Sequence, residues 1–233
     1  MTKLKSPLTS VHARLDGLQG LTGAILALFL LVHIHFESTI LLGKEAFFQV
    51  VQMLEGGWFT HDGMGEPFVT RVFSLFLLSV LVLHAFAALR RFPTHYRQWR
   101  ALRQHMGVVQ HQDTKLWFWQ LITGFSLFFV VPVHLFTMML NPEIGPHFSA
   151  ARVVHESAWL LYAILLPAVV FHAVIGMYRL CIKWGGFNAR AGARKLAFIL
   201  LVYLLVMGIF SLLTYVNIGM DLPLDFEPYG GHH

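Results

Sequence analysis

The sequence is poor in charged residues and almost lacks cysteine. Only 12% of its 233 residues are Asp, Glu, Lys or Arg, compared with roughly 25% in a soluble domain. Its one cysteine, Cys181, excludes a disulfide within the chain, and the absence of a C-x-x-C-H motif argues against covalently attached c-type haem. The chain also has no Rossmann fingerprint and no set of cysteines for an iron–sulfur cluster.

Hydrophobic residues make up 56% of the chain, and they gather in five runs at 19–42, 68–89, 116–140, 157–180 and 196–217. Each run reaches the roughly 20 residues that cross a hydrocarbon core. A helix satisfies its own backbone in lipid, and the alternating short strands of an outer-membrane barrel are absent. The first run is too long for a signal peptide. We therefore predict an all-α fold, a single domain that forms a five-helix transmembrane bundle.

Lys and Arg lie mainly on one side of these predicted spans. Fourteen of the 17 basic residues precede the first span, separate the second from the third, or lie between the end of the fourth span and the start of the fifth. By the positive-inside rule the N-terminus is cytoplasmic and the C-terminus lies outside. The asymmetry explains a pI of about 9.6 without a nucleic-acid partner, because a basic face suits membrane lipid headgroups or a cytoplasmic partner.

Four histidines lie deep within four different spans, at positions 33, 84, 134 and 172. His33 and His134 are each 19 residues from the nearest cytoplasmic basic residue, whereas the other two are 6 and 7 residues from theirs. At 1.5 Å per residue the two depths are about 28 Å and about 10 Å. One buried histidine is equally well explained by a hydrogen bond between helices, but four on four helices are not.

Two imidazoles that face each other across a bundle are the usual axial ligands of a b-type haem. The depths therefore predict two haems b. His84 and His172 would hold the inner haem, and His33 and His134 the outer one.

Two internal repeats support these pairs. Residues 19–33 and 120–134 both read Q-x-x-T-G, nine mostly apolar residues and His. We expect Gly23 and Gly124 to lie near the inner haem, where a missing side chain lets the macrocycle approach; ordinary helix packing is the alternative. A second phrase begins at the inner histidines and carries an arginine seven residues later, Arg91 and Arg179.

Four segments resemble a known family: "HIHFESTILLG", "HAFAALRRFPTHYRQW", "DTKLWFWQLITGF" and "HAVIGMYRLCIKWGGF". They look like the dihaem cytochrome b subunit of quinol:fumarate reductase and its succinate dehydrogenase relatives, over almost the whole chain. The resemblance implies an anchor in the bacterial inner membrane with two haems b. It would pass electrons between menaquinol or menaquinone and cytoplasmic flavoprotein and iron–sulfur subunits, for fumarate reduction or succinate oxidation. These three subunits would form a heterotrimer, and a dimer of that heterotrimer is possible.

The resemblance also implies roles for single residues. It agrees with the two histidine pairs, and it matches an arginine near the outer haem's propionates to Arg152. A glutamate of the first outer loop, which accepts the quinol's proton, corresponds to Glu55. The residues themselves offer a rival in Glu37, one helical turn after His33 and on the same face. The collar around the inner haem's propionates corresponds to Gln19, Trp117, Gln120 and Lys183.

At one position this chain differs from the family that it resembles, and the difference bears on energy coupling. The family's best-known members carry a glutamate two residues before the fourth ligand, which resembles a proton path, and this chain has Val170 there. No Asp or Glu lies in the inner halves of the five spans. We therefore predict that electron flow from menaquinol to fumarate is electrogenic.

Two other functions remain open from the residues alone. One is the cytochrome b anchor of a hydrogenase or formate dehydrogenase, which would share four buried histidines. The other is a haem-free transporter that uses His and Glu as a proton relay, although such transporters have broken helices in matching halves.

Overall fold

The computed structural model describes residues 7–61, 63–108, 112–185 and 190–231. It is 84% helical, and the residues described contain no strand. Lys3 and Lys5, which contributed to the predicted orientation, lie outside the described residues. The elements are α1 (Pro7–Glu37), η1 (Ser38–Leu42), α2 (Lys44–Leu54), η2 (Gly57–Phe59), α3 (Pro67–Leu89), α4 (Tyr96–Val108), α5 (Gln112–Leu140), α6 (Pro146–Val154), α7 (Trp159–Lys183), α8 (Arg190–Met220) and η3 (Tyr229–Gly231).

Five helices are long and apolar enough to cross a membrane, namely α1 continued by η1, α3, α5, α7 and α8. This confirms the predicted all-α, five-span architecture. The helices are longer than the predicted spans: α1 begins at Pro7 rather than at 19, and α8 at Arg190 rather than at 196. Hydropathy marks only the part of a helix that faces hydrocarbon, and a helix continues into the polar zone until its end groups reach water.

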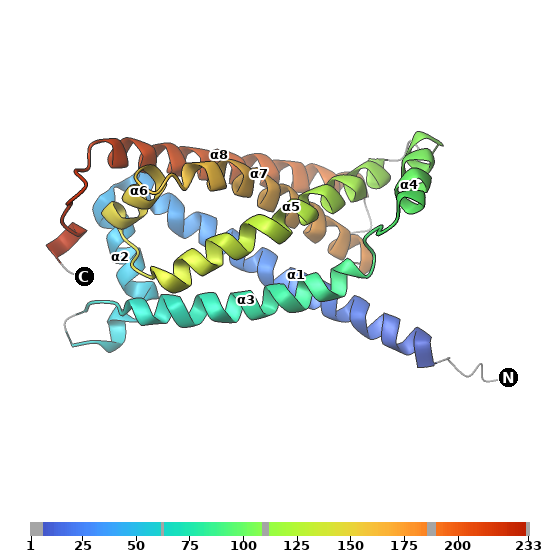
Figure 1. Cartoon of the computed structure of the whole chain (residues 1–233), viewed down its shortest axis with the longest axis horizontal. Helices are drawn as coiled ribbons and strands as arrows, with labels where there is room; N and C mark the ends of the chain where they lie inside the picture. The colour runs from blue at the N-terminus through green and yellow to red at the C-terminus, as the bar shows by residue number, and fades with distance from the viewer. Residues whose placement is uncertain (1–6, 62, 109–111, 186–189, 232–233) are drawn as a thin grey trace.

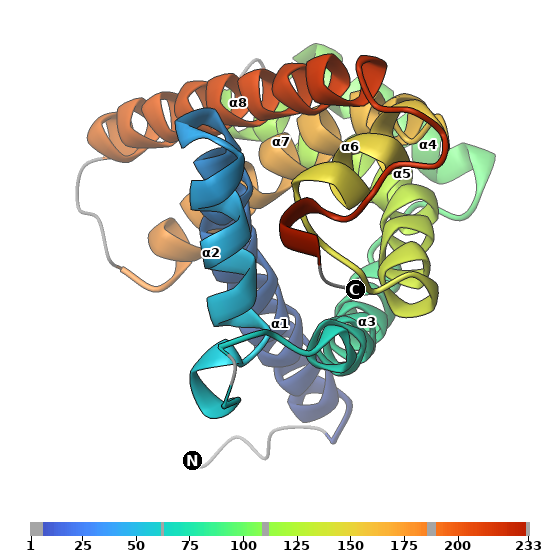
Figure 2. The same cartoon turned by 90° about the vertical axis from the view of Figure 1, so that its left-hand side faces the viewer.

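Four of these helices surround a common axis. α1 packs against α3 and α7, and α5 packs against the same two helices from the other side. α8 lies outside this ring, against α7 and α1. Figures 1 and 2 show the ring from the side and from one end. The arrangement places four helices around one interior, with the fifth as an outer support.

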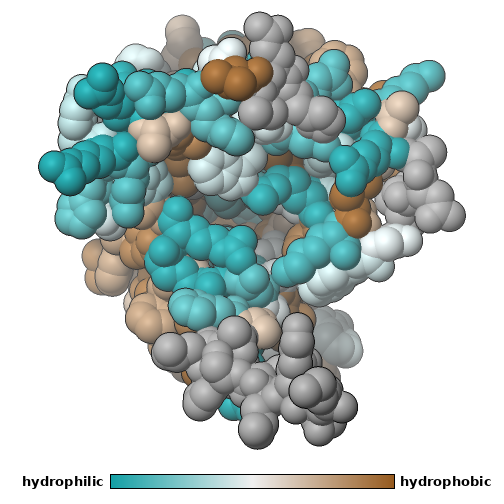
Figure 3. All heavy atoms as spheres, turned by 90° about the vertical axis from the view of Figure 1, so that its right-hand side faces the viewer, coloured by the Kyte–Doolittle hydropathy of each residue, from teal (hydrophilic) through white to brown (hydrophobic). Residues whose placement is uncertain are grey.

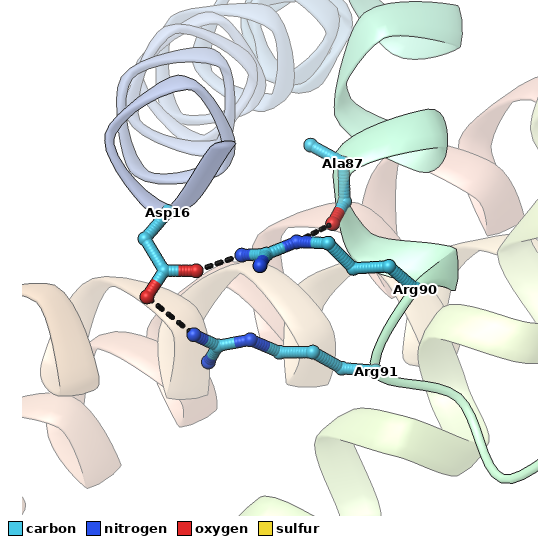
Figure 4. Close-up of polar contacts among 4 residues, drawn as sticks. All are labelled: Asp16, Ala87, Arg90 and Arg91. Carbon is cyan, nitrogen blue, oxygen red and sulfur yellow. Dashed lines mark hydrogen bonds and ion pairs between the residues drawn. The ribbon is translucent and has the colours of Figure 1, made fainter. Parts of the chain in front are cut away.

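We call the end at which α1, α5 and α8 begin the basic end. Hydrophilic side chains cover much of the face seen there (Figure 3). The Asp16 carboxylate of α1 forms ion pairs with Arg90 and Arg91, which follow α3 (Figure 4). Arg90 Nε also donates to the main-chain oxygen of Ala87 at 2.8 Å. These contacts fix the start of α1 against the end of α3.

At the other end, which we call the opposite end, α2 lies across the bundle between α8 and α3 (Figure 2). Phe47 and Val51 of α2 are buried in a cluster with Val153 of α6 and Tyr215 of α8. Phe47 is only 1% exposed. This small core holds in place the connection from α2 to α3, on which Glu55 lies.

Candidate functional site

A cavity of about 1070 Å³ lies inside the ring of helices. Drug-sized ligands occupy pockets of about 300–1,000 Å³, so this one suits a larger ligand or several. Every site residue predicted from the sequence lines it: His33, His84, His134, His172, Glu37, Glu55, Gln19, Gly23, Trp117, Gln120, Gly124, Arg152 and Lys183. One interior therefore joins the predicted inner and outer sites.

The histidines form two facing pairs across this cavity. The ring centroids of His84 and His172 are 6.3 Å apart, and those of His33 and His134 are also 6.3 Å apart. A metal ion bound by two opposed imidazoles, with bonds of about 2 Å each, holds the ring centres roughly 6 Å apart. The pairs join the residues that the depth count joined, and both separations fit bis-imidazole ligation of a haem iron.

The Q-x-x-T-G phrase of α5 holds the imidazole of His172. His172 Nδ1 donates to the main-chain oxygen of Gln120 at 3.0 Å. Thr123 Oγ1 lies 3.5 Å from the same nitrogen and donates its own proton to the Trp119 oxygen. A proton fixed on Nδ1 leaves the Nε2 lone pair free to bind a metal.

The same phrase in α1 holds His84. Thr22 Oγ1 donates to the Leu18 oxygen at 2.7 Å and lies 3.1 Å from His84 Nδ1. The repeated phrase therefore does not serve the histidine at its own end. It supports the inner histidine of the neighbouring helix.

Gly23 and Gly124 have a closer neighbour than the expected macrocycle. A Cβ added at Gly23 would lie 2.9 Å from His84 Cε1, and one added at Gly124 would lie 2.8 Å from His172 Cε1. The missing side chains admit the imidazole rings themselves. Small residues at these two positions are therefore needed to leave room for the two imidazole rings.

The pair nearer the opposite end has different surroundings. Phe29 stacks on His33 with ring centroids 5.2 Å apart, and Tyr162 meets His134 edge-on at 5.7 Å. Within the described residues, His134 Nδ1 is buried without a hydrogen-bond partner. Among the described residues, His134 therefore lacks the carbonyl partner that His172 has.

Arg152 is almost fully buried beside this second pair, with 6% exposure. One of its terminal nitrogens donates to the main-chain oxygens of Asn141 and Glu143, at 3.0 and 3.1 Å. Its Nε has no partner within the described part of the chain. A buried guanidinium with a nitrogen to spare at the cavity wall suits an acidic group, such as a haem propionate.

Polar residues also line the cavity toward the basic end. Gln19, Trp117 and Lys183 line it, and Gln120 Oε1 accepts a hydrogen bond from Arg179. Arg91 lines it as well. The arginines of the second repeat, Arg91 and Arg179, therefore line the cavity together with the residues predicted to surround the inner haem's propionates.

Glu55 is buried at the opposite end, with 5% exposure. Thr70 Oγ1 donates to its Oε1 at 2.7 Å, and the Glu66 amide donates to its main-chain oxygen at 3.0 Å. Burial raises the pKa of Glu55 to about 7, against the lowering effect of the Thr70 hydrogen bond. A Cβ at Gly65 would lie 2.5 Å from Glu55 Cβ, so the returning loop can cover this carboxylate only with glycine there.

The rival, Glu37, reaches the same cavity from α1. Tyr215 of α8 donates to its Oε2 at 2.9 Å. Tyr215 is itself buried, with 5% exposure. Both carboxylates therefore line the cavity, and each accepts a hydrogen bond from one hydroxyl group.

Comparison with known proteins identifies the family. Residues 96–210 match the family model described as "Succinate dehydrogenase/Fumarate reductase transmembrane subunit". The chain is 43% identical over 216 residues to the fumarate reductase cytochrome b subunits of two strains of Helicobacter pylori, covering 91% of this chain and 84% of theirs. It is 40% identical to the subunit of that name from Wolinella succinogenes, over 90% and 84%.

The chain belongs to the succinate dehydrogenase/fumarate reductase transmembrane subunit family. The predicted resemblance is confirmed, and the chain is a multi-pass membrane protein. Membership of this family decides against the hydrogenase or formate dehydrogenase anchor and against the haem-free transporter. The roles of single residues in this family member remain predictions.

Several residues that contact the histidines or the two carboxylates were not predicted from the sequence. Thr22 and Thr123 stand inside the repeated phrase, so the repeat itself was the available signal. Thr70 lies fifteen residues after Glu55, and no spacing rule joins a loop carboxylate to the first turn of the next helix. Tyr162 and Tyr215 lie in apolar runs where their hydroxyls give no pattern.

We predict that replacing Gly23 or Gly124 by Ala displaces one imidazole and removes about half of the bound haem b. The added Cβ would lie under 3 Å from an imidazole ring whose position is fixed by a hydrogen bond, to the Gln120 oxygen for His172 and to Thr22 Oγ1 for His84. Gly17→Ala is the matched control on α1, since no atom lies within 4 Å of its added Cβ. Haem b per polypeptide is measured from the alkaline pyridine spectrum. Full haem content in Gly124→Ala would contradict the role of the glycine.

Proposed function

We propose that this chain is the membrane anchor and electron conduit of a menaquinol:fumarate reductase or succinate dehydrogenase of the bacterial inner membrane. The observation that carries the proposal is the equal 6.3 Å spacing of two imidazole pairs, stacked along one cavity. Each haem b, when bound, would take up and give back one electron at a time. Two haems bound along one cavity would give electrons a route between the two faces of the membrane.

His84 and His172 would hold the inner haem, with Gln19, Trp117, Gln120 and Lys183 around its propionates. His33 and His134 would hold the outer haem, with Arg152 as the cation for its propionates. The donor set supports this assignment. Imidazoles whose Nδ1 donates to a carbonyl offer Nε2 to iron, and buried cations at the cavity wall offset carboxylates that would otherwise be costly in lipid.

The basic end would face the cytoplasm, in agreement with the positive-inside rule. A flavoprotein subunit and an iron–sulfur subunit would bind there, because this chain contains neither a dinucleotide fingerprint nor a set of cysteines. The relatives carry the name of fumarate reductase subunits, which supports such partners for this chain. Fumarate or succinate would react on the flavoprotein, away from the membrane.

Quinol would be oxidised at the opposite end, beside Glu55. Oxidation of a quinol to a quinone releases two electrons and two protons, so the site needs a base open to the cavity. Thr70 occupies Oε1 of Glu55, which leaves Oε2 to accept a quinol proton. A general base works best with a pKa near the working pH, and a pKa of about 7 meets that requirement.

Replacing Glu55 with Gln should lower menaquinol oxidation by about 100-fold or more, the lower part of the range for a positioned general base. Both haems should remain, and a dye that donates directly to the soluble subunits should still support fumarate reduction. Glu66→Gln is the matched control, because Glu66 is an exposed neighbour in the same loop. Normal menaquinol oxidation in Glu55→Gln would contradict the role of Glu55 as the proton acceptor. Glu37 would then be the candidate, and the same assay on Glu37→Gln would test it.

Replacing Thr70 with Val should move the acidic limb of the pH profile for menaquinol oxidation to higher pH. The Thr70 hydrogen bond lowers the pKa of Glu55, so its loss raises that pKa, and a larger share of Glu55 stays protonated and inactive at neutral pH. Thr70→Ser keeps the hydroxyl and should restore the profile. An unchanged limb in Thr70→Val, with haem content intact, would remove Thr70 from the site.

Electron flow from menaquinol to fumarate should build a membrane potential. Protons would leave on the outer side and be taken up in the cytoplasm, while electrons cross inward. Val170 is 0% exposed within an apolar cluster that includes Leu30, Ile34 and Leu204, so no carboxylate at that position carries a compensating proton. Charge movement costs about 2.3 kcal/mol per elementary charge per 100 mV. Proteoliposomes of the whole complex should show a dye signal that a protonophore abolishes; turnover in tight vesicles without that signal would reveal a proton path.

A further inference from the structure

The short helix α4 lies on the flank of the bundle rather than beneath it. It stands beside the start of α5 and runs across the direction of the spans (Figures 1 and 2). Trp99 of α4 meets Phe92 edge-on at 5.5 Å, and Phe92 stacks on Phe125 of α5 at 5.2 Å. Leu102 and His105 share a small hollow with Asp113 of α5. These contacts attach α4 to α5 beside Phe125, whose side chain is 48% exposed on the outside of the bundle. Trp117 and Arg179, which also line the central cavity, complete the hollow.

The two sides of α4 differ in chemistry. Trp99, Leu102 and Met106 are half-buried and follow helical spacing, which places them on one face toward the bundle. Arg97, Arg100 and Arg103 are exposed, and α4 contains no acidic residue. Among the described residues, none of these three arginines forms an ion pair. Three cations with no ion-pair partner in the described part of the chain therefore lie beside the first turns of α5.

We propose that α4 is an interfacial helix whose three arginines bind anionic lipid headgroups of the leaflet at the basic end. An amphipathic helix with a basic polar face lies in the plane of the interface and is attracted to anionic lipid. The position on the flank of α5 decides between the two anions that could meet these arginines. A soluble subunit would cover the end face of the bundle, whereas lipid headgroups surround its sides.

The test uses the whole complex, purified in a neutral detergent and titrated with phosphatidylglycerol or phosphatidylcholine. Retained lipid is counted by native mass spectrometry. Arg97→Gln, Arg100→Gln and Arg103→Gln are made singly and together, and each lost arginine should weaken phosphatidylglycerol binding by about five-fold. Phosphatidylcholine binding should stay the same. The difference should shrink at 1 M salt, where the Debye length is only about 3 Å.

The matched control removes three positive charges elsewhere at the basic end, with Arg14→Gln, Lys115→Gln and Lys195→Gln on three different helices. All three are exposed. Equal loss of phosphatidylglycerol binding in the control and in the α4 variant would overturn the proposal, because net charge alone would then explain it. Unchanged lipid binding in the α4 variant, with loss of the soluble subunits from the complex, would overturn it in favour of a protein partner. Haem spectra show whether each variant is folded, and the single substitutions keep the test valid if the triple variant is not.

Discussion

The rest of this bundle depends on holding the inner pair of imidazoles in hydrocarbon with one nitrogen hydrogen-bonded and the other free. An unpaired buried polar atom is costly, and a ligand that rotates cannot hold a metal in place. The chain solves this for the inner pair with backbone. A carbonyl of the adjacent helix accepts the Nδ1 proton of His172, a threonine oxygen lies beside the same atom, and a glycine admits the ring.

That requirement shapes the packing around it. Each inner histidine needs its neighbour helix at ring-contact distance, so α1 must lie against α3 and α5 against α7. The ion pairs of Asp16 with the two arginines after α3 hold the first contact at its polar end. At the other end, α2 crosses the bundle and its buried Phe47 holds the loop that covers Glu55. The same frame therefore positions both the ligands and the candidate base.

Much of this could be predicted from the sequence because the membrane enforces simple rules. Apolar runs gave the five spans, and counting residues from the basic ends gave the two histidine pairs, since depth in a straight helix is proportional to residue number. Boundaries were too short, because hydropathy does not register the polar turns of α1 and α8. The short helices α2, α4 and α6 were not predicted, since none is long or apolar enough to stand out.

The supporting contacts could not be predicted in the same way. The repeat drew attention to Gly23 and Gly124, but the group that fills the space beside each of them depends on how two helices cross, and sequence spacing does not contain that information. The Thr70 hydrogen bond joins a loop to a helix and depends on the path of the loop. The family resemblance singled out Glu55 and Arg152, but only the fold explains their burial and their donors.

The central claim is that the four histidines act as two pairs, one for each haem. Its most direct test is optical redox titration of the purified complex carrying His33→Ala, His84→Ala, His134→Ala or His172→Ala. The account predicts that His84→Ala and His172→Ala lose one and the same haem component, and that His33→Ala and His134→Ala lose the other. Loss of the same component in His33→Ala and His84→Ala, with the second component intact, would contradict it.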